Sequence, residues 1–293
     1  MNKSRARDSK NPQQIIIKKI NNEVVKAVPL LEPEDNRPVL GANLFPEIYA
    51  NIFLCARKKS GKSSVIYNII KKCADKNTTI VAFVSTLHKD KNWATIQLHC
   101  ELNNIPFIGY TIIFDDDDGH DVLDELVAEL SELNDINTMS ENLRPENAHL
   151  LLLCDDEEDE KEIKPRKSKY QVPEYIFIFD DLSTELKSRS LTSLLKKNRH
   201  IRCKIIISSQ YLNDLAPQSR KQLDYFLIFK GQPQAKLDEI YRDADIHVSK
   251  KLFYNLYQHA SHDKFSFLYV DTVNSKFRRN FNQEYTIPEN INI

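Results

Sequence analysis

Short apolar runs recur along the chain, and each is followed by a polar or helix-length segment. The runs cover residues 51–56, 78–85, 106–114, 175–181, 204–210, 225–231 and 265–272. Runs of this length without polar alternation are typical of strands covered on both faces, and the segments between them leave room for crossover helices. Apolar spacing predicts helices over 62–74, 121–133 and 182–197. The pattern therefore predicts an α/β fold with a mainly parallel central sheet flanked by helices.

The ends of the chain and two internal segments depart from this pattern. Residues 1–45 carry basic residues early and prolines later, which predicts an N-terminal extension. We expect a single domain over 46–275 and a C-terminal tail over 276–293. The segments 115–121 and 155–169 are rich in charged residues and poor in apolar ones, as is typical of solvated loops.

Composition and charge narrow the class of protein. Hydrophobic residues make up 41% of the chain and charged residues 28%, as in soluble globular proteins. The net charge of -1 excludes a uniformly basic surface, so nucleic-acid binding would need a local patch. The five cysteines show no metal-ligand spacing, which favours reduced thiols in a cytosol-like compartment. No apolar run approaches the roughly 20 residues that span a bilayer, so we expect an intracellular protein without a membrane span.

The segment NIFLCARKKSGKSSVIYNII, residues 51–70, nearly matches the phosphate-binding pattern G-x-x-x-x-G-K-[S/T]. A strand-like run precedes the match and a helix-like run follows it, as the motif requires. In that geometry the backbone N–H groups of the loop surround the phosphates of ATP. Lys62 would contact the β- and γ-phosphates, and the Ser63 hydroxyl would hold Mg²⁺. The predicted nucleotide-binding residues are Ala56, Arg57, Lys58, Lys59, Ser60, Gly61, Lys62, Ser63 and Ser64.

Ala56 occupies the position of the first glycine of the pattern. That position lies at the exit of the strand, where alanine adds a single methyl group. Gly61, in contrast, lies where the backbone must approach phosphate closely. We therefore expect the substitution to be tolerated.

Two further apolar strands end in polar side chains that suit ATP hydrolysis. YIFIFDD supplies Asp180 as a second ligand for Mg²⁺ and Asp181 as a general base for the attacking water. The gap between Lys62 and Asp180 contains at least one more strand, which is the arrangement of the additional-strand branch of P-loop NTPases. KIIISSQ ends at Gln210, whose amide would sense the γ-phosphate or orient the water.

The order of these motifs resembles the poxvirus-type genome-packaging ATPases of large DNA viruses and their relatives in the FtsK/HerA superfamily. The resemblance covers about residues 48–275. It rests on the P-loop, FIFDDL, an N-R-H triplet, a strand ending SSQ, an arginine ten residues later, DYFLIFKG and LDEIYRD. The departures are Ala56 and the two charged segments.

The resemblance implies an ATPase motor that forms a homo-oligomeric ring, expected to be a hexamer. It implies that the motor pumps double-stranded DNA into a viral capsid, with a capsid or portal component as its partner. It implies a location in the host cytoplasm or viral factory, or association with the virion. Ring ATPases commonly complete each site with an arginine from the neighbouring subunit. Arg220 is the candidate for this role, and Arg199 competes with it.

A stretch without acidic residues gives independent support for a DNA partner. Between Leu186 and Asn213 the chain has no Asp or Glu, and its basic residues are Lys187, Arg189, Lys196, Lys197, Arg199, Arg202 and Lys204. Such a patch would neutralise phosphates without reading bases. The alternatives are a solvated helix and loop, or a subunit interface that uses Arg199 and His200.

Two other functions remain open on the sequence. One is a helicase or another ring ATPase that acts on nucleic acid, because the motifs do not separate duplex pumping from strand separation. The other is a degenerate P-loop module that binds nucleotide without turnover.

Overall fold

The computed structural model describes residues 35–115, 119–142, 169–182 and 184–287. The chain divides into two compact units, Met1–Asn36 and Arg37–Ile293. The first unit lies almost wholly outside the described residues, as do Cys154, residues 116–118 of the first charged segment and residues 155–168 of the second. The fold below is that of the second unit.

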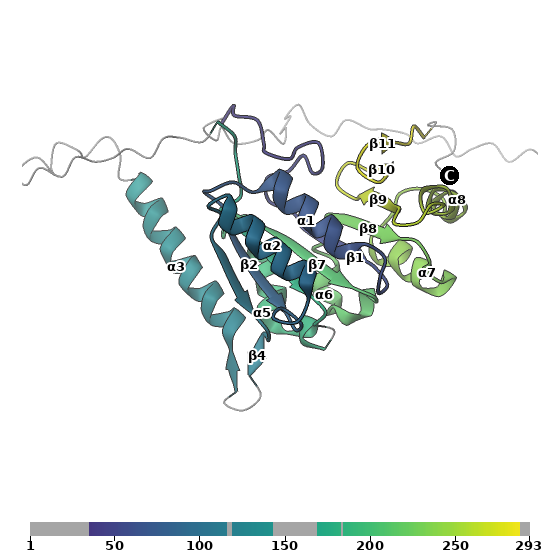
Figure 1. Ribbon diagram of the computed structural model, residues 1–293. Helices are drawn as coiled ribbons and strands as arrows, with labels where there is room; N and C mark the ends of the chain where they lie inside the picture. The colour runs from purple at the N-terminus through teal and green to yellow at the C-terminus, as the bar shows by residue number, and fades with distance from the viewer. Residues whose placement is uncertain (1–34, 116–118, 143–168, 183, 288–293) are drawn as a thin grey trace, which may run out of the picture. The chain divides into compact units, whose positions relative to one another are not determined.

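Within the described residues, nine strands form one sheet in the order β11-β10-β9-β8-β1-β7-β6-β2-β3 (Figure 1). The strands of its parallel part are β1 (Asn51–Cys55), β2 (Thr79–Val84), β3 (Phe107–Tyr110), β6 (Tyr175–Asp180), β7 (Cys203–Ser209) and β8 (Tyr225–Phe229). The antiparallel part adds β9 (Phe267–Asp271), β10 (Lys276–Arg279) and β11 (Gln283–Glu284). β4 (Phe114–Asp115) and β5 (His120–Asp121) form a separate pair. The predicted mainly parallel α/β sheet is confirmed, and β7 lies between β1 and β6.

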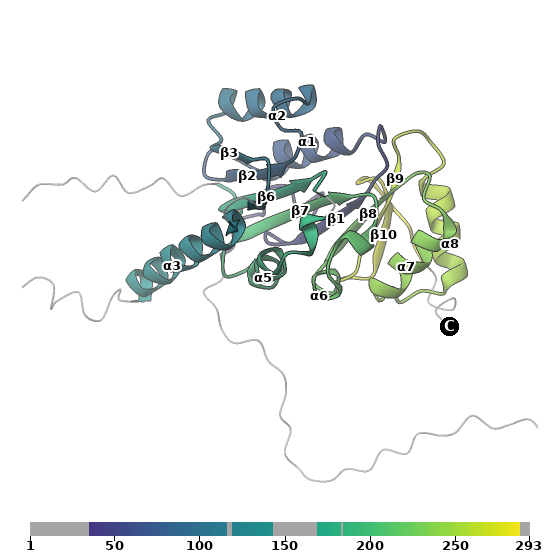
Figure 2. The same cartoon turned by 90° about the horizontal axis from the view of Figure 1, so that it is seen from below.

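Helices cover both faces of the sheet (Figure 2). One face carries α1 (Lys62–Cys73) and α2 (Lys91–Leu102). The other carries α3 (Val122–Asn142), α5 (Arg189–Lys197), α7 (Gln234–Asp243) and α8 (Lys250–Ala260), with the short α6 (Pro217–Arg220). The single turns η1 (Glu185–Lys187) and η2 (Leu212–Asp214) complete the connections.

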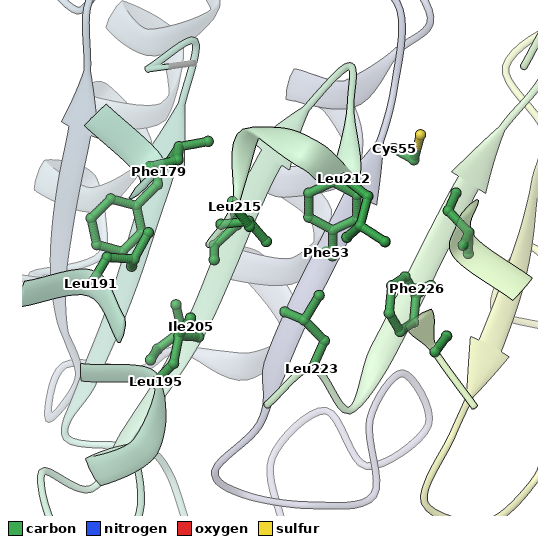
Figure 3. Packing of buried hydrophobic residues seen from close by; sticks show 14 of the residues in the cluster. Phe53, Cys55, Phe179, Leu191, Leu195, Ile205, Leu212, Leu215, Leu223 and Phe226 are labelled. Atoms are coloured by element: carbon green, nitrogen blue, oxygen red, sulfur yellow. The ribbon is translucent and has the colours of Figure 1, made fainter. Parts of the chain in front are cut away.

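Two apolar clusters, one on each face, hold the layers together. In the cluster shown in Figure 3, Phe53 of β1 and Phe226 of β8 lie with their ring centroids 6.1 Å apart, and both are fully buried. The cluster on the opposite face joins α1 and α2 to the sheet. The strands β1, β2, β6, β7 and β8 are buried on both faces, so their sequences read as continuous apolar runs rather than alternating ones.

Polar side chains fix the starts of several helices. The Asp90 carboxylate accepts the Asn92 N–H at the start of α2, and the Ser188 and Ser249 hydroxyls accept backbone N–H groups at the starts of α5 and α8. Like α6 and α7, α1 begins without a side-chain cap, and it follows directly after Gly61. Its first N–H groups therefore remain available to another acceptor.

Several expected boundaries differ from the observed ones. The run 106–114 splits into β3 and β4, and the helix expected over 182–197 begins only at Arg189. Residues 37–45 belong to the compact unit, because Leu44 and Phe45 are buried in its core. β10 and β11 continue the sheet through part of the segment expected as a tail. Among the described helices, none has the length and apolar character needed to cross a membrane.

Candidate nucleotide site

The P-loop connects β1 to α1 at the carboxyl end of the parallel strands. Two of its residues have left-handed backbone, Lys59 with φ 62° and Gly61 with φ 94°. Gly61 immediately precedes α1, so this turn aims the uncapped start of the helix into the loop. The Ser60 hydroxyl is buried and has no hydrogen-bond partner among the described residues. These features fit a loop that receives an anion through backbone N–H groups.

Ala56 continues the line of β1 rather than turning the chain. Its side chain is buried, and its N–H donates to the Ser209 carbonyl over 3.0 Å. It is not among the residues with positive φ, so its conformation does not need a glycine. The departure from the glycine pattern thus leaves the turn at Lys59 and Gly61 intact.

Lys62 joins the loop to the acidic end of β6. Its Nζ lies 2.8 Å from Asp180 Oδ1 and 2.6 Å from Asp181 Oδ1. Burial acts to lower the pKa of Lys62, but the two carboxylates outweigh it and raise the pKa. The ammonium group is therefore held fully charged at the place where a triphosphate would enter.

Asp180 is buried, with 2% of its side chain exposed. Burial raises the pKa of this carboxyl, and the neighbouring Lys62 ammonium acts against that rise. Its second oxygen accepts the indole N–H of Trp93, from α2, at 3.4 Å. A carboxylate held by one cation and one N–H donor has a fixed orientation, which suits a metal ligand.

Asp181 differs from Asp180 in exposure and in backbone conformation. Its side chain is 43% exposed, and its φ is 58°. The Ser85 hydroxyl donates to the Asp181 carbonyl over 2.9 Å, which ties the end of β6 to the end of β2. A non-glycine residue in this left-handed conformation is costly and is commonly found at functional sites. The turn places its carboxylate outside the sheet, where water can reach it.

The P-loop borders two clefts that meet at Asp181. The larger, of about 840 Å³, is lined by Lys58, Lys59, Gly61, Lys62, Ser63, Ser64, Thr86, Lys89, Asp90, Lys91, Asn92, Asp181 and Phe265. The smaller, of about 540 Å³, shares Lys58, Thr86 and Asp181 with the first and adds Ser208, Ser209 and Gln210. Gln210 and the P-loop thus lie on connected clefts.

Gln210 is held mainly through its backbone. Its carbonyl accepts the Lys236 ammonium over 2.8 Å, and that ammonium also lies 3.5 Å from the centroid of the Tyr211 ring. The Ser209 hydroxyl beside it donates to the Asp214 carboxylate. Among the described residues, the side-chain amide of Gln210 forms no hydrogen bond, so it is free to contact a ligand in the smaller cleft.

Arg220 lies outside both clefts. Its Nη1 is 2.9 Å from Asp243 Oδ2 and 3.7 Å from Glu239 Oε1, and its Nε donates to the Leu215 carbonyl. Only 13% of its side chain is exposed. The guanidinium is thus engaged within its own subunit, whereas the competing candidate Arg199 is exposed.

The basic stretch 187–204 is only partly a surface patch. Its exposed members are Lys187, Arg189, Lys196, Lys197 and Arg199, on or beside α5. Arg202 pairs with Glu174 over 2.8 Å. The inclusion of Lys204 was wrong, because its side chain is fully buried and donates to the Glu47 carbonyl over 2.9 Å. Position 204 lies inside β7, which both helical layers cover.

The sequence did not predict three residues that hydrogen-bond to the proposed catalytic and metal-binding residues: Trp93, Ser85 and Lys236. Their contacts join residues that are 87, 96 and 26 positions apart. The sequence carried one signal for Ser85: it is the last residue of the apolar run 78–85, just as Asp181 and Gln210 are the last residues of their runs. Nothing local marked Trp93 or Lys236.

Ser63 and Asp180 are suited to hold Mg²⁺ together with phosphate oxygens. Hydroxyl and carboxylate oxygens are the ligands this ion prefers, and it usually retains water and substrate phosphates. Among the described residues there is no group of three or more His, Cys, Asp and Glu side chains that could hold a metal by itself. A cation here would therefore depend on the nucleotide for its remaining ligands.

Comparison with solved structures finds viral packaging proteins and the ATPase protein EssC. B204, the genome packaging NTPase of Sulfolobus turreted icosahedral virus 2, in complex with AMP, has 17% identity and a TM-score of 0.45, covering 79% of this chain and 97% of that chain. B204, the DNA-packaging ATPase of Sulfolobus turreted icosahedral virus, has 16% identity and a TM-score of 0.46, covering 83% and 100%. EssC (ATPases 2 and 3) of Geobacillus thermodenitrificans has 12% identity and a TM-score of 0.36, covering 61% and 32%.

No curated protein matches the sequence. A family model does: the model described as Poxvirus A32 protein matches residues 134–281, which is half of the chain. The match includes β6 with Asp180 and Asp181, β7 with Gln210, and Arg220. The chain therefore belongs to the poxvirus A32 protein family.

Proposed function

We propose that this protein is an ATP-hydrolysing motor that packages double-stranded DNA into a viral capsid. The observation that carries the proposal is the meeting of Lys62 with Asp180 and Asp181 at the end of the sheet. It brings a phosphate-binding loop and a pair of carboxylates into one site, as ATP hydrolysis requires.

ATP binding would exchange the partners of Lys62. The triphosphate enters the larger cleft, where Lys62 moves from the two carboxylates to the phosphates and α1 offers its uncapped N–H groups. The exchange releases Asp180 as a ligand, with Ser63, for Mg²⁺. Held by these two residues, Mg²⁺ would neutralise charge on the phosphates. Asp181 is released at the same time.

Asp181 is the general base in this proposal. Its carboxylate is exposed at the junction of the two clefts, where it can accept a proton from the attacking water. Gln210, on the smaller cleft, orients that water through its amide or senses the γ-phosphate. Arg220 of a neighbouring subunit stabilises charge on the transferred phosphoryl group, provided that subunit contact frees it from Asp243. Arg199 is the alternative.

DNA binds to the exposed basic residues on and beside α5 in this proposal. Lys196 and Lys197 are adjacent in the last turn of the helix, and both are exposed. Phosphate contacts of this kind tolerate any sequence, as a translocating motor needs. The motor works as a homo-oligomeric ring, which we expect to be a hexamer. Its partner is a capsid or portal component, and it acts in the host cytoplasm, the viral factory or the virion.

Phosphate release measured with ATP and Mg²⁺, with and without blunt double-stranded DNA at low salt, tests this proposal. We expect DNA to stimulate the rate, and Lys62→Ala to abolish both the basal and the stimulated rates. A rate that stays flat across the DNA titration would argue against a motor. Bound nucleotide without phosphate release would instead indicate a module without turnover. Displacement of a third strand from a blunt duplex, without unwinding of a forked one, distinguishes translocation from helicase activity.

A further inference from the structure

Phe265 is an exposed aromatic residue beside the P-loop. Its side chain is 55% exposed, and its backbone has φ 66°. Bulky residues rarely adopt this left-handed conformation, because it is sterically costly for any side chain with a Cβ atom. Folding alone gains little from such a residue, since the ring is more exposed than buried.

The turn that carries Phe265 is well anchored. It connects α8 to β9, and the Ser266 hydroxyl donates to the Asp263 carbonyl over 2.8 Å. The next residue, Phe267, donates its N–H to the Asn280 side chain over 3.2 Å. Hydrogen bonds thus hold the backbone of the turn that carries the ring.

The ring of Phe265 packs over the glycine of the P-loop. A Cβ atom placed on Gly61 would lie 3.2 Å from Phe265 Cδ1 and 3.6 Å from its Cβ. Phe265 lines the larger cleft together with Gly61, Lys62 and Ser63. It also lines a neighbouring cleft of about 230 Å³ with Arg57 and other basic residues. The aromatic surface therefore borders the place where the phosphates are expected.

We propose that Phe265 is the stacking platform for the base of the bound nucleotide. The proposal rests on the proposed nucleotide function and adds to it the residue that holds the base. Aromatic rings stack on any nucleobase through their π faces. The Lys264 ammonium, 4.8 Å from the ring centroid, makes a cation–π contact that a base would replace or extend.

Recognition by a ring face has a consequence for specificity. Stacking does not read the exocyclic groups that distinguish adenine from guanine, and a purine covers more of the ring than a pyrimidine does. We therefore expect ADP and GDP to bind with similar affinity through this contact, and UDP to bind less tightly. This preference for purines should depend on the aromatic ring.

Calorimetric titration of the full-length protein with ADP and with inorganic pyrophosphate, both with Mg²⁺, tests the platform. Phe265→Ala and Phe265→Leu should weaken ADP binding by roughly tenfold and leave pyrophosphate binding unchanged. Phe265→Tyr should restore ADP binding. Lys62→Ala should weaken both ligands. Tyr170→Ala is the matched control, because Tyr170 is also exposed, at 36%, with the Lys169 ammonium 5.7 Å from its ring centroid.

Two results would overturn the platform. One is unchanged ADP affinity in Phe265→Ala. The other is an equal loss of ADP and pyrophosphate affinity, which would mean that the ring only shapes the turn at Gly61. If pyrophosphate binds too weakly to measure, the contrast between Phe265→Tyr and Phe265→Leu decides. Failure of the proposed nucleotide function would be distinguished from these two results, because the unmodified protein would then bind neither ADP nor pyrophosphate.

Discussion

Trp93 donates its indole N–H to the Asp180 carboxylate over 3.4 Å, and it is the chain's single tryptophan. Its side chain is fully buried. Because Asp180 is the proposed ligand for Mg²⁺, a change in its partners alters the field at the indole. We predict that Mg²⁺ with ATP shifts or quenches the tryptophan emission.

Trp93→Phe should remove the fluorescence signal and weaken Mg²⁺ binding by roughly tenfold, since the carboxylate loses a fixed donor. Mg²⁺ titration of the ATPase rate measures this effect. A tryptophan emission spectrum that does not change at saturating Mg²⁺ and ATP would contradict the proposed role of Asp180.

Asp181→Asn should bind ATP normally and lose hydrolysis by roughly 10²-fold or more, because an amide cannot accept the proton of the attacking water. Lys62→Ala should lose nucleotide affinity as well as turnover. Parallel measurement of binding and phosphate release separates the two variants. Normal turnover in Asp181→Asn would place the base elsewhere.

Arg220→Ala should lower the free energy of unfolding by about 2 kcal/mol at pH 7, because it leaves Asp243 and Glu239 without this cation. Partial burial acts to raise the pKa of Asp243, but hydrogen bonds from Arg220 and Arg242 outweigh it and lower the pKa. A lowered pKa adds stability above the unfolded value of about 3.9, and this stability disappears as the pH falls through the folded value. Urea unfolding should therefore show the difference from the unmodified protein shrinking below about pH 4. Lys221→Ala, exposed and adjacent, should show no such difference.

Mixed rings separate this structural role of Arg220 from a catalytic one. Subunits with Arg220→Ala and subunits with Asp181→Asn, each inactive alone, should together regain part of the activity if Arg220 acts on the neighbouring site. Mixed rings of verified composition without recovery would restrict Arg220 to its own subunit.

The double substitution Lys196→Ala and Lys197→Ala should weaken DNA binding for all sequences alike and reduce the salt slope of the affinity by about 2. Fluorescence anisotropy at several salt concentrations measures both effects. Lys204→Met is the matched control, because the buried Lys204 cannot reach a phosphate. A similar loss of DNA affinity in Lys204→Met, with the fold intact, would contradict this distinction.

Ala56→Gly should leave turnover unchanged, because Ala56 is absent from the residues with left-handed backbone. The glycine should cost at most about 1 kcal/mol of stability through the greater freedom of the unfolded chain. Steady-state kinetics and thermal unfolding test the two expectations. A large loss of turnover would show that the methyl group itself supports the loop.

The sequence was sufficient to predict the strands of the parallel sheet and to assign Lys62 and Asp180 to one site, but not their direct ion pair. Strands buried on both faces leave continuous apolar runs, and the carboxyl ends of parallel strands share one edge, so their terminal residues converge. Lys204 shows the limit of counting charges along the sequence. A count of basic residues does not distinguish a lysine inside a buried strand from a lysine on the surface. The partners of Arg220 and Trp93 depend on how distant helices pack, which no local pattern specifies.

The single strand β7 separates the two strands that carry the P-loop and Asp180. Because β7 separates β1 from β6, the P-loop and Asp180 start from strands two spacings apart, about 10 Å. Lys62 bridges this separation, because its Nζ lies 2.8 Å from Asp180 Oδ1. β7 ends at Ser209, directly before Gln210, so the strand between the two motifs also positions a residue that lines the smaller cleft. Displacing β7 would therefore move Gln210 relative to the P-loop and Asp180, in addition to weakening the sheet.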